Sequence, residues 1–378
     1  MLTRAAFENF RVLKGVTVDL APFTVLVGPN GAGRTSVLRG VDMVCRLREP
    51  QAGEVVRGLG RPAILLGEPK DLMSWRTGGS SAPWRVVVSG DGGVVGLEVR
   101  DAGEGWRFRL RADDRVGIFP PLQSPADTMV YEAPALANLP RPLLLQPTAR
   151  ALAAPSYVEG DVPSVASDGS GLASVLTHLA GNDPDRFQAI QDALRAVVPG
   201  VRRVRTPRAK VVVHTKETIE WDGNRLARDV PREMWGNAIQ IDIGPHGAID
   251  ADATSEGTLI ALALLTVLHD PAGPTLVLID DLASTLHPKA QADLIAAIRK
   301  VQALRPGLQV IATSHSPYLI DHMDPSEVRV MGIAADGYAR CLPLTQHPRY
   351  ERLSRGLGAG EFWAAVGEDW TGGDPDAA

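Results

Sequence analysis

An apolar, strand-like run meets a glycine-rich turn in "TVLVGPNGAGRTS", residues 24–36. The P-loop pattern requires a glycine, four residues, a second glycine, a cation and a hydroxyl, and here Gly28, Gly33, Arg34 and Thr35 take these places. The glycines let backbone N–H groups converge on phosphate oxygens, and the helix that follows points its positive dipole end at the same anion. The stretch therefore predicts a phosphate-binding loop. The alternative is a strand-to-helix turn that binds nothing.

The composition is that of an ordinary globular protein. The 378 residues carry 39 Lys and Arg against 44 Asp and Glu, a net charge of -5, so a surface for nucleic acid must be a local patch. Cys45 and Cys341 lie in unrelated contexts without metal-ligand spacing, which is typical of a reducing compartment. The most apolar run, residues 259–268, is too short to cross a bilayer, and the first residues do not begin a signal peptide. We therefore expect a cytoplasmic protein without a membrane segment.

Strand and helix patterns alternate along the chain. The last third predicts, in order, a helix at 256–268, a buried strand at 275–279, a helix at 288–304, a buried strand at 308–312, a helix at 317–321 and a strand at 327–332. Such alternation is typical of a parallel sheet covered on both faces. The segments 84–88, 94–99 and 106–110 instead predict an antiparallel β-meander. The expected fold class is α/β, with a parallel core sheet flanked by helices and an antiparallel β lobe.

Two further buried strands end in polar side chains. "TLVLIDD", residues 275–281, ends in Asp280 and Asp281, and "QVIATSHSPYLI", residues 309–320, places His315 after its strand. Parallel strands bring their carboxyl ends to one edge of the sheet, where ligands bind. There Asp280 can hold Mg²⁺ through water, and Asp281 can polarise an attacking water. His315 can contact a phosphate or that water. The alternatives are an acidic turn and a structural histidine.

Taken in this order, the motifs resemble those of one family. The chain is similar to the ABC-type ATPases of the RecF, SMC and OLD-like group, which includes the stand-alone AAA family ATPases of the AAA_21 and AAA_15 kind. The supporting stretches are "FENFRVLKGVTVDLAPFTVLVGPNGAG" (7–33), "SDGSGLASVLTHLAGNDPDRFQAIQDALRAVVPGV" (167–201), "TSEGTLIALALL" (254–265), "LASTLHP" (282–288) and "GAGEFWAAV" (358–366). The resemblance covers most of the chain and is least defined over 48–130 and 202–250.

The resemblance implies one P-loop NTPase head over 1–378. Residues 1–47 and 254–378 would form the nucleotide-binding core lobe, 48–130 an inserted β-meander, and 131–253 a lobe of helices and strands. The cofactors implied are ATP and Mg²⁺. The ATP-binding residues implied are Gly28, Asn30, Gly31, Gly33, Arg34, Thr35 and Ser36.

The resemblance also assigns roles beyond the loop. Thr35 and Asp280 would bind the metal, and Asp281 and His315 would be catalytic. Ser255 and Gly257 would form the signature that caps the nucleotide of a partner head in an ATP-dependent homodimer. Gln146 is a candidate for the family's glutamine loop.

Two residues depart from the family pattern. Arg34 stands in place of the P-loop lysine, and its planar guanidinium is longer and bulkier than an ammonium. Asp281 stands where this group usually has glutamate, which is one methylene longer. Misplacing a catalytic group by about 1 Å can cost on the order of 10²-fold in rate. We therefore expect ATP to bind and its hydrolysis to be slow or absent.

The biological role is less defined. OLD-type proteins carry a C-terminal Toprim nuclease domain and SMC proteins a long coiled coil, and we expect neither in this chain. The interpretation favoured is a head that drives a separately encoded effector, such as a nuclease in anti-phage defence. The alternative is a RecF-like DNA-binding repair clamp that tracks phosphates with Arg202, Arg203, Arg205, Arg208 and Lys210. That basic stripe could equally be a solvated strand edge. A transporter subunit is disfavoured by the sequences "SEGT" and "LHP".

Overall fold

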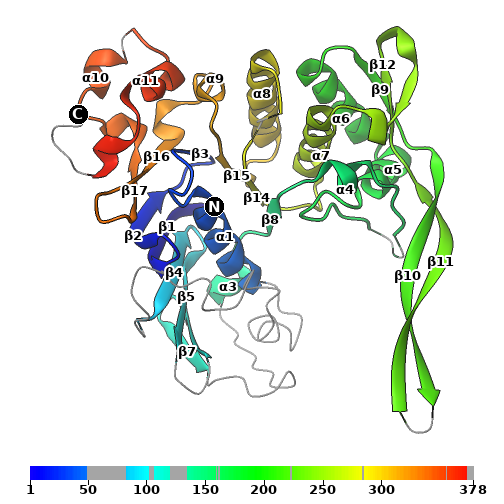
Figure 1. Cartoon of the computed structure of the whole chain (residues 1–378), viewed down its shortest axis with the longest axis horizontal. Helices are drawn as coiled ribbons and strands as arrows, with labels where there is room; N and C mark the ends of the chain where they lie inside the picture. The colour runs from blue at the N-terminus through cyan, green and yellow to red at the C-terminus, as the bar shows by residue number, and fades with distance from the viewer. Residues whose placement is uncertain are drawn as a thin grey trace. The chain divides into compact units, whose positions relative to one another are not determined.

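The computed structural model describes residues 1–48, 82–101, 106–119, 134–158, 160, 162–221, 224–282, 285–354 and 356–372. The chain divides into two compact units (Figure 1). Unit 1 comprises Met1–Leu144, Pro274–Ser284 and Gln302–Ala378, and unit 2 comprises Leu145–Gly273 and Thr285–Val301. Each unit is therefore assembled from segments that lie far apart in the sequence.

The core sheet of unit 1 contains the strands that carry the predicted motifs. Its strand order is β17-β16-β3-β15-β14-β8. The bounds are β3 (Phe23–Val27), β8 (Pro142–Leu145), β14 (Leu276–Ile279), β15 (Gln309–Thr313), β16 (Val328–Ile333) and β17 (Ala339–Pro343). Strands β14, β15, β3 and β16 run parallel, and every residue of β3, β14 and β15 is buried. Their continuous apolar runs suit a sheet with both faces covered. The predicted parallel core sheet is confirmed.

A second, antiparallel sheet of unit 1 has the order β2-β1-β4-β5-β6-β7. Its strands are β1 (Leu2–Phe10), β2 (Leu13–Asp19), β4 (Trp84–Gly90), β5 (Gly93–Asp101), β6 (Trp106–Ala112) and β7 (Arg115–Phe119). The predicted meander is present, but it continues the N-terminal hairpin instead of forming a sheet of its own. The register explains this, because Phe7 lies opposite Val86 and Val86 lies opposite Leu97, which builds one continuous buried face. Residues 49–81, 102–105 and 120–130 of the predicted insertion lie outside the described residues.

Helix α1 (Arg34–Cys45) contacts both sheets of unit 1. Its buried residues Val37, Leu38 and Val41 share one hydrophobic core with residues of both sheets. The helix approaches the second sheet closely, since a Cβ on Gly40 would lie 2.6 Å from the Phe7 ring. This packing fixes the helix that begins at the phosphate loop. Short elements complete unit 1: η1 (Arg46–Arg48), α3 (Pro134–Ala137), α9 (Pro317–Ile320), η6 (Pro325–Glu327), η7 (Leu344–Gln346), α10 (Tyr350–Leu353), α11 (Ala359–Val366) and η8 (Asp369–Gly372).

Unit 2 combines helices with two small antiparallel sheets. Its helices are α4 (Ala149–Ala153), α5 (Leu172–Asn182), α6 (Pro184–Val197), η4 (Gly244–His246), η5 (Ala251–Ala253), α7 (Glu256–His269) and most of α8 (Pro288–Leu304). Strands β13 (Ala248–Asp250), β12 (Gln240–Ile243) and β9 (Val201–Arg205) form one sheet in that order. Strands β10 (Arg208–Trp221) and β11 (Asn224–Asn237) form a long two-stranded ribbon (Figure 1).

Helix α7 lies in a different unit from the one that the sequence predicts. The prediction placed residues 254–378, which include α7, in one lobe with the phosphate loop. In the structure α7 belongs to unit 2 and packs against α4, α5 and α6. The reason is its composition, because most of its residues are apolar and eleven of its fourteen residues are buried, so it needs partners on several sides. No helix within the described residues is long and apolar enough to cross a membrane.

Candidate functional site

The glycine-rich loop begins where β3 ends. Gly28 has a φ of 143°, and a Cβ at this position would lie 2.0 Å from the carbonyl oxygen of Met331 on the neighbouring strand β16. Gly33 has a φ of 91° and precedes the first residue of α1. Both are backbone conformations that residues with a Cβ rarely adopt. The loop therefore needs glycine at these positions, which leaves its backbone accessible to a phosphate.

The N-terminus of α1 lies at the end of this loop. Gly33 is the N-cap residue and has no side chain that could cap the helix. The first N–H groups of a helix have no partner within the helix, and the dipole concentrates positive charge at that end. The twelve-residue helix α1 therefore offers a site for an anion next to the loop.

Thr35, Asp280 and Thr313 lie together although they are far apart in sequence. The Thr35 hydroxyl donates to the two carboxylate oxygens of Asp280 at 3.1 and 3.0 Å, and the Thr313 hydroxyl donates to Asp280 at 2.9 Å. The parallel neighbours β14 and β15 place Asp280 and Thr313 at the same sheet edge. Hydroxyl and carboxylate oxygens, with phosphate oxygens and water, are the ligands that Mg²⁺ prefers. The arrangement fits a magnesium ion carried in by a phosphate ligand.

That ion would depend on its phosphate ligand. Within the residues that the structure describes, no cluster of three or more His, Cys, Asp or Glu side chains could hold a metal ion. Mg²⁺ commonly uses only one or two protein oxygens together with substrate phosphates. Thr35 and Asp280 suit that mode of binding.

Asp281 follows in an unusual backbone conformation. Its φ is 58°, which is left-handed, and its side chain is exposed. The Asp281 N–H donates to the Thr313 hydroxyl at 2.7 Å, and the Leu282 N–H donates to the Thr313 carbonyl at 2.8 Å. Aspartate tolerates this region better than longer side chains do. The conformation therefore gives a physical reason for aspartate here. Residues 283 and 284 of the predicted "LASTLHP" loop lie outside the described residues.

Arg34 turns into the site instead of toward solvent. It is only 8% exposed, and its guanidinium donates to the Ser314 carbonyl at 3.0 Å and to the Asn30 side chain at 3.4 Å. A second donor of the guanidinium contacts Nε2 of His315. Burial lowers the pKa of Arg34, and the negative charges of Asp280, Asp281 and Glu368 oppose that shift. Arg34 thus ties the phosphate loop to the end of β15.

His315 is the acceptor in its contact with Arg34. A guanidinium has only donors, so the His315 Nε2 atom must be unprotonated and the remaining proton must lie on Nδ1. Burial lowers the pKa of His315, and the positive charge of Arg34 lowers it further. The imidazole is therefore neutral at pH 7 and is oriented by the arginine.

Glu368 is the acid of this site that sequence reasoning missed. It follows α11, and its segment packs on β16, where Gly332 leaves room for Thr371. Burial raises the pKa of Glu368, and its charge acts on Arg34. The motif "GAGEFWAAV" ends two residues before Glu368 and is the sequence signal that could have drawn attention to this position.

The predicted signature residues lie in unit 2. Ser255 is exposed and is the N-cap of α7, where its hydroxyl accepts from the Thr258 N–H at 3.4 Å. Gly257 is buried in the first turn, and a Cβ there would lie 2.8 Å from the Thr285 carbonyl oxygen. Gln146 follows β8, and its N–H donates to the Ser167 carbonyl at 2.8 Å. The roles of these three residues remain predictions.

The predicted basic stripe is partly neutralised, since two of its five residues pair with carboxylates. Arg205 donates to Asp242 at 2.8 and 2.9 Å, Lys210 pairs with Glu233 at 2.9 Å, and Arg208 lies over the Trp235 ring. The other two arginines, Arg202 and Arg203, are exposed on β9. The stripe therefore offers less free positive charge than its sequence indicates.

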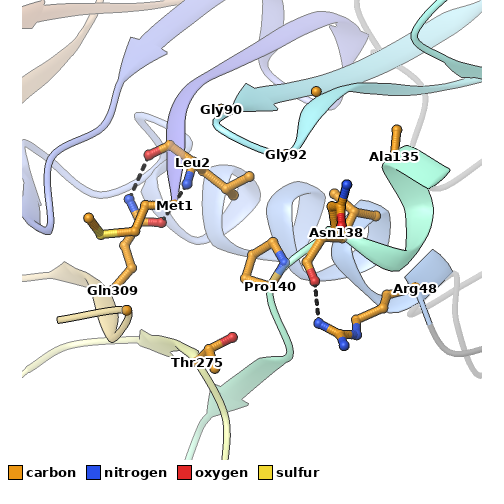
Figure 2. Close-up of a pocket in the computed structure, with 13 residues that line it drawn as sticks. Met1, Leu2, Arg48, Gly90, Gly92, Ala135, Asn138, Pro140, Thr275 and Gln309 are labelled. Carbon is orange, nitrogen blue, oxygen red and sulfur yellow. Dashed lines mark hydrogen bonds between the residues drawn. The ribbon is translucent and has the colours of Figure 1, made fainter. Parts of the chain in front are cut away.

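Unit 1 also contains a cavity of about 190 Å³ that is lined by residues outside the predicted nucleotide site (Figure 2). Its polar side chains bind the protein itself: Gln309 accepts from the Leu2 N–H at 2.9 Å, and Arg48 donates to the Leu139 carbonyl at 2.7 Å. Figure 2 shows both interactions at the cavity wall. The residues of the predicted nucleotide site do not line this cavity. It is therefore distinct from the phosphate loop.

Comparisons with known proteins show which proteins the chain is similar to. Residues 164–321 match the AAA_21 family, described as "AAA domain, putative AbiEii toxin, Type IV TA system". The chain is 50% identical over 44 residues to an OLD nuclease of Thermus scotoductus, which is 12% of this chain and 8% of that protein. It is 40% identical over 74 residues to the Septu protein PtuA of Bacillus thuringiensis, 19% of this chain and 18% of that protein.

A third relative and a solved structure extend the comparison. The chain is 43% identical over 60 residues to the DNA replication and repair protein RecF of Erwinia tasmaniensis, 15% of this chain and 17% of that protein. Each match thus spans less than a fifth of the relative. An SMC head bound to the C-winged helix domain of ScpA has a TM-score of 0.54 at 13% identity, covering 90% of this chain and 96% of that structure. The chain therefore has the fold of an SMC ATPase head, and its residues 164–321 are similar to the AAA_21 family.

Proposed function

We propose that this chain binds Mg-ATP at the loop of residues 28–36 and hydrolyses it slowly. The observation that carries the proposal is the contact of Thr35 and Thr313 with Asp280, beside a loop that only glycine can form. Thr35 and Asp280 would hold Mg²⁺, which neutralises phosphate charge when it is bound. Asn30, Gly31, Gly33 and Ser36 would complete the nucleotide contacts.

Slow hydrolysis follows from the positions of the remaining side chains. The Arg34 guanidinium already donates to Ser314 and contacts His315, so it is not a free point charge for the terminal phosphates. The exposed Asp281 side chain is one methylene shorter than glutamate and projects from a left-handed backbone. An error of about 1 Å in a catalytic group can cost on the order of 10²-fold. Neutral His315 is left to contact the terminal phosphate or the attacking water.

The proposal includes an ATP-dependent homodimer. Ser255 is exposed at the N-terminus of the 14-residue helix α7, so the positive end of the helix dipole is open to an anion there, while the Ser255 hydroxyl caps the helix at Thr258. Gly257 keeps the first turn of α7 close to Thr285. A two-fold arrangement would let each head supply this helix end to the nucleotide of the other, and hydrolysis would then open the dimer.

The dimer would act as a switch for a separately encoded effector. The matches to an OLD nuclease and to the Septu protein PtuA, together with a family description that names a toxin and a toxin–antitoxin system, support a nuclease-like effector and a role in anti-phage defence. The second candidate is a DNA repair clamp, supported by the match to RecF and by exposed Arg202 and Arg203. Charge reversal of Arg202 and Arg203 would abolish salt-sensitive DNA binding in a clamp and leave a defence switch unaffected.

Equilibrium dialysis with ATP and Mg²⁺ tests the nucleotide site. Asp280→Asn and Thr35→Val should each weaken Mg-ATP binding by on the order of 10-fold or more, because each loses part of the magnesium environment. Asp293→Asn is the matched control, since Asp293 pairs with Lys289 on α8 and lies outside the proposed site. Unchanged affinity in both site variants would refute the proposed magnesium role.

A further inference from the structure

A hollow of about 390 Å³ lies on the face of the second sheet that is turned away from α1. Its floor is apolar. Val87, Val94, Gly96 and Val116 line it, and Val94 and Val116 are 36% and 54% exposed. Gly96 creates the depth, since a Cβ there would lie 3.1 Å from Val87. The sheet thus presents an exposed apolar depression that a single side chain of a partner could fill.

Arginines surround this depression. Arg85, Arg109 and Arg111 line it. The register adds Arg100 directly opposite Arg107, on the same face. Like charges that lie directly opposite each other on two paired strands destabilise the sheet. The chain therefore holds these arginines at an energetic cost that a negatively charged partner would offset.

Glu98 positions part of the arginine rim without neutralising it. Its side chain is 9% exposed, and Arg85 lies 2.7 Å away, Arg100 3.7 Å and Arg109 3.9 Å. These arginine side chains remain 41%, 51% and 47% exposed. Glu8, which also pairs with Arg85, and Asp114, which lines the hollow, are two further acids near these arginines. Positive charge remains in excess and accessible.

We propose that this surface, the arginine hollow, binds an acidic segment of a partner protein. An apolar side chain of the partner would fill the depression above Gly96, and flanking carboxylates would bind Arg109 and Arg111 bidentately. An apolar centre inside a polar rim with arginine at its edge is the usual anatomy of a protein interface. If this partner is the effector of the proposed ATP switch, the effector carries an acidic segment, and in that respect the proposal rests on the proposed function.

The floor of the hollow distinguishes a protein partner from nucleic acid. Proteins that bind single strands stack bases on aromatic side chains. Among the described residues, the hollow is lined by valine, glycine, arginine and acids, with no aromatic side chain. Valines match an aliphatic side chain, whereas they leave a base without a stacking partner. A single-stranded oligonucleotide is therefore the competing ligand in the test.

Fluorescence anisotropy with synthetic peptides tests the arginine hollow on the full chain. The probe is a labelled EELLEE peptide, and the control peptides are QQLLQQ and EESSEE. We expect saturable binding of EELLEE that weakens with salt and is at least about 10-fold tighter than binding of either control, because each control loses charge or apolar contact. Arg109→Gln and Arg111→Gln should each weaken binding roughly 10-fold. Val116→Glu should abolish it.

Arg4→Gln is the matched control, because Arg4 lies in the same sheet and pairs with Asp19 outside the hollow. Equal binding of QQLLQQ, unchanged affinity in all three hollow variants, or tighter binding of the oligonucleotide at the same arginines would overturn the proposal. Melting temperature and Mg-ATP binding of each variant report whether it is folded. If Mg-ATP binds and EELLEE does not, only the hollow proposal fails. If Mg-ATP itself does not bind, the proposed function fails.

Discussion

Replacing Arg34 by lysine is the sharpest perturbation of the proposed site. Arg34 reaches from α1 to the end of β15, where it donates to the Ser314 carbonyl at 3.0 Å and contacts His315, and it also donates to Asn30 of the phosphate loop at 3.4 Å. Lysine keeps the positive charge but lacks the planar fork, so it cannot reproduce this set of contacts. The variant therefore separates the structural use of the arginine from its use as a phosphate ligand.

The contacts set the size of the expected effects. A hydrogen bond from a charged donor contributes about 1.5–3 kcal/mol, and lysine can regain one such bond, so Arg34→Lys should cost about 2 kcal/mol. For a chain of 378 residues that corresponds to a drop in Tm of roughly 2–3 °C without nucleotide. A free ammonium near the terminal phosphates should at the same time raise the rate of ATP hydrolysis, by roughly 10-fold to 10²-fold.

Differential scanning fluorimetry without nucleotide and phosphate release with saturating Mg-ATP measure the two effects. Arg39→Lys is the matched control, because Arg39 lies in the same helix outside the proposed site. The reasoning is refuted if Arg34→Lys leaves both the Tm and the rate of phosphate release unchanged. A wild-type chain that already hydrolyses ATP as fast as the lysine variant would show that the arginine does not slow the reaction.

Three further predictions address the loop, the histidine and the signature helix. Gly28→Ala should abolish Mg-ATP binding and lower the Tm, because its Cβ would lie 2.0 Å from the Met331 oxygen, whereas Gly15→Ala, with nothing within 4 Å, should change neither. In the folded chain, burial and Arg34 lower the pKa of His315. As the pH falls, His315 is therefore protonated in the unfolded chain before it is protonated in the folded chain, and the free energy of unfolding should fall below about pH 6.5. Thermal unfolding between pH 7.5 and 5.5 should show a smaller loss in His315→Gln, and an equal loss would contradict this assignment. Ser255→Ala should destabilise α7 by about 1 kcal/mol and reduce the ATP-dependent dimer in light scattering, while Mg-ATP binding to the monomer is unchanged.

The sequence predicted the parts of the site that follow buried parallel strands. Continuous apolar runs mark β14 and β15, and the polar residues directly after such strands must meet at one sheet edge. Asp280 and Thr35 come together for this reason, although 245 positions separate them. Local patterns suffice here because strand direction alone determines where the side chains lie.

Contacts made by long side chains could not be predicted in this way. The Arg34 guanidinium contacts the Ser314 carbonyl because the side chain is buried, and that burial depends on the packing of the whole fold. The same holds for the left-handed backbone of Asp281 and for the position of Glu368 near Arg34. No spacing or composition rule connects residue 34 with residue 368.

Strand pairing was the other part that the sequence left open. The meander joins the N-terminal hairpin because β4 pairs with β1. Residues 49–81 lie between the two paired segments in sequence, and no local pattern specifies a pairing across that distance. Strand β11 was missed because "NRLARDVPREMWGN" contains a proline and no continuous apolar run. Strand β9 ends at Arg205, and the next strand along the chain, β10, begins at Arg208. Pro207 lacks an N–H group and marks this break.

Size-exclusion chromatography with light scattering, with and without Mg-ATP and followed by phosphate release on the same sample, tests the central claim most directly. The account predicts that the molar mass doubles with Mg-ATP, that Asp280→Asn prevents the doubling, and that little phosphate is released. A chain that stays at one mass and binds no nucleotide would contradict the ATP site itself. Rapid phosphate release that is unaffected by Asp281→Ala would contradict the account of slow hydrolysis.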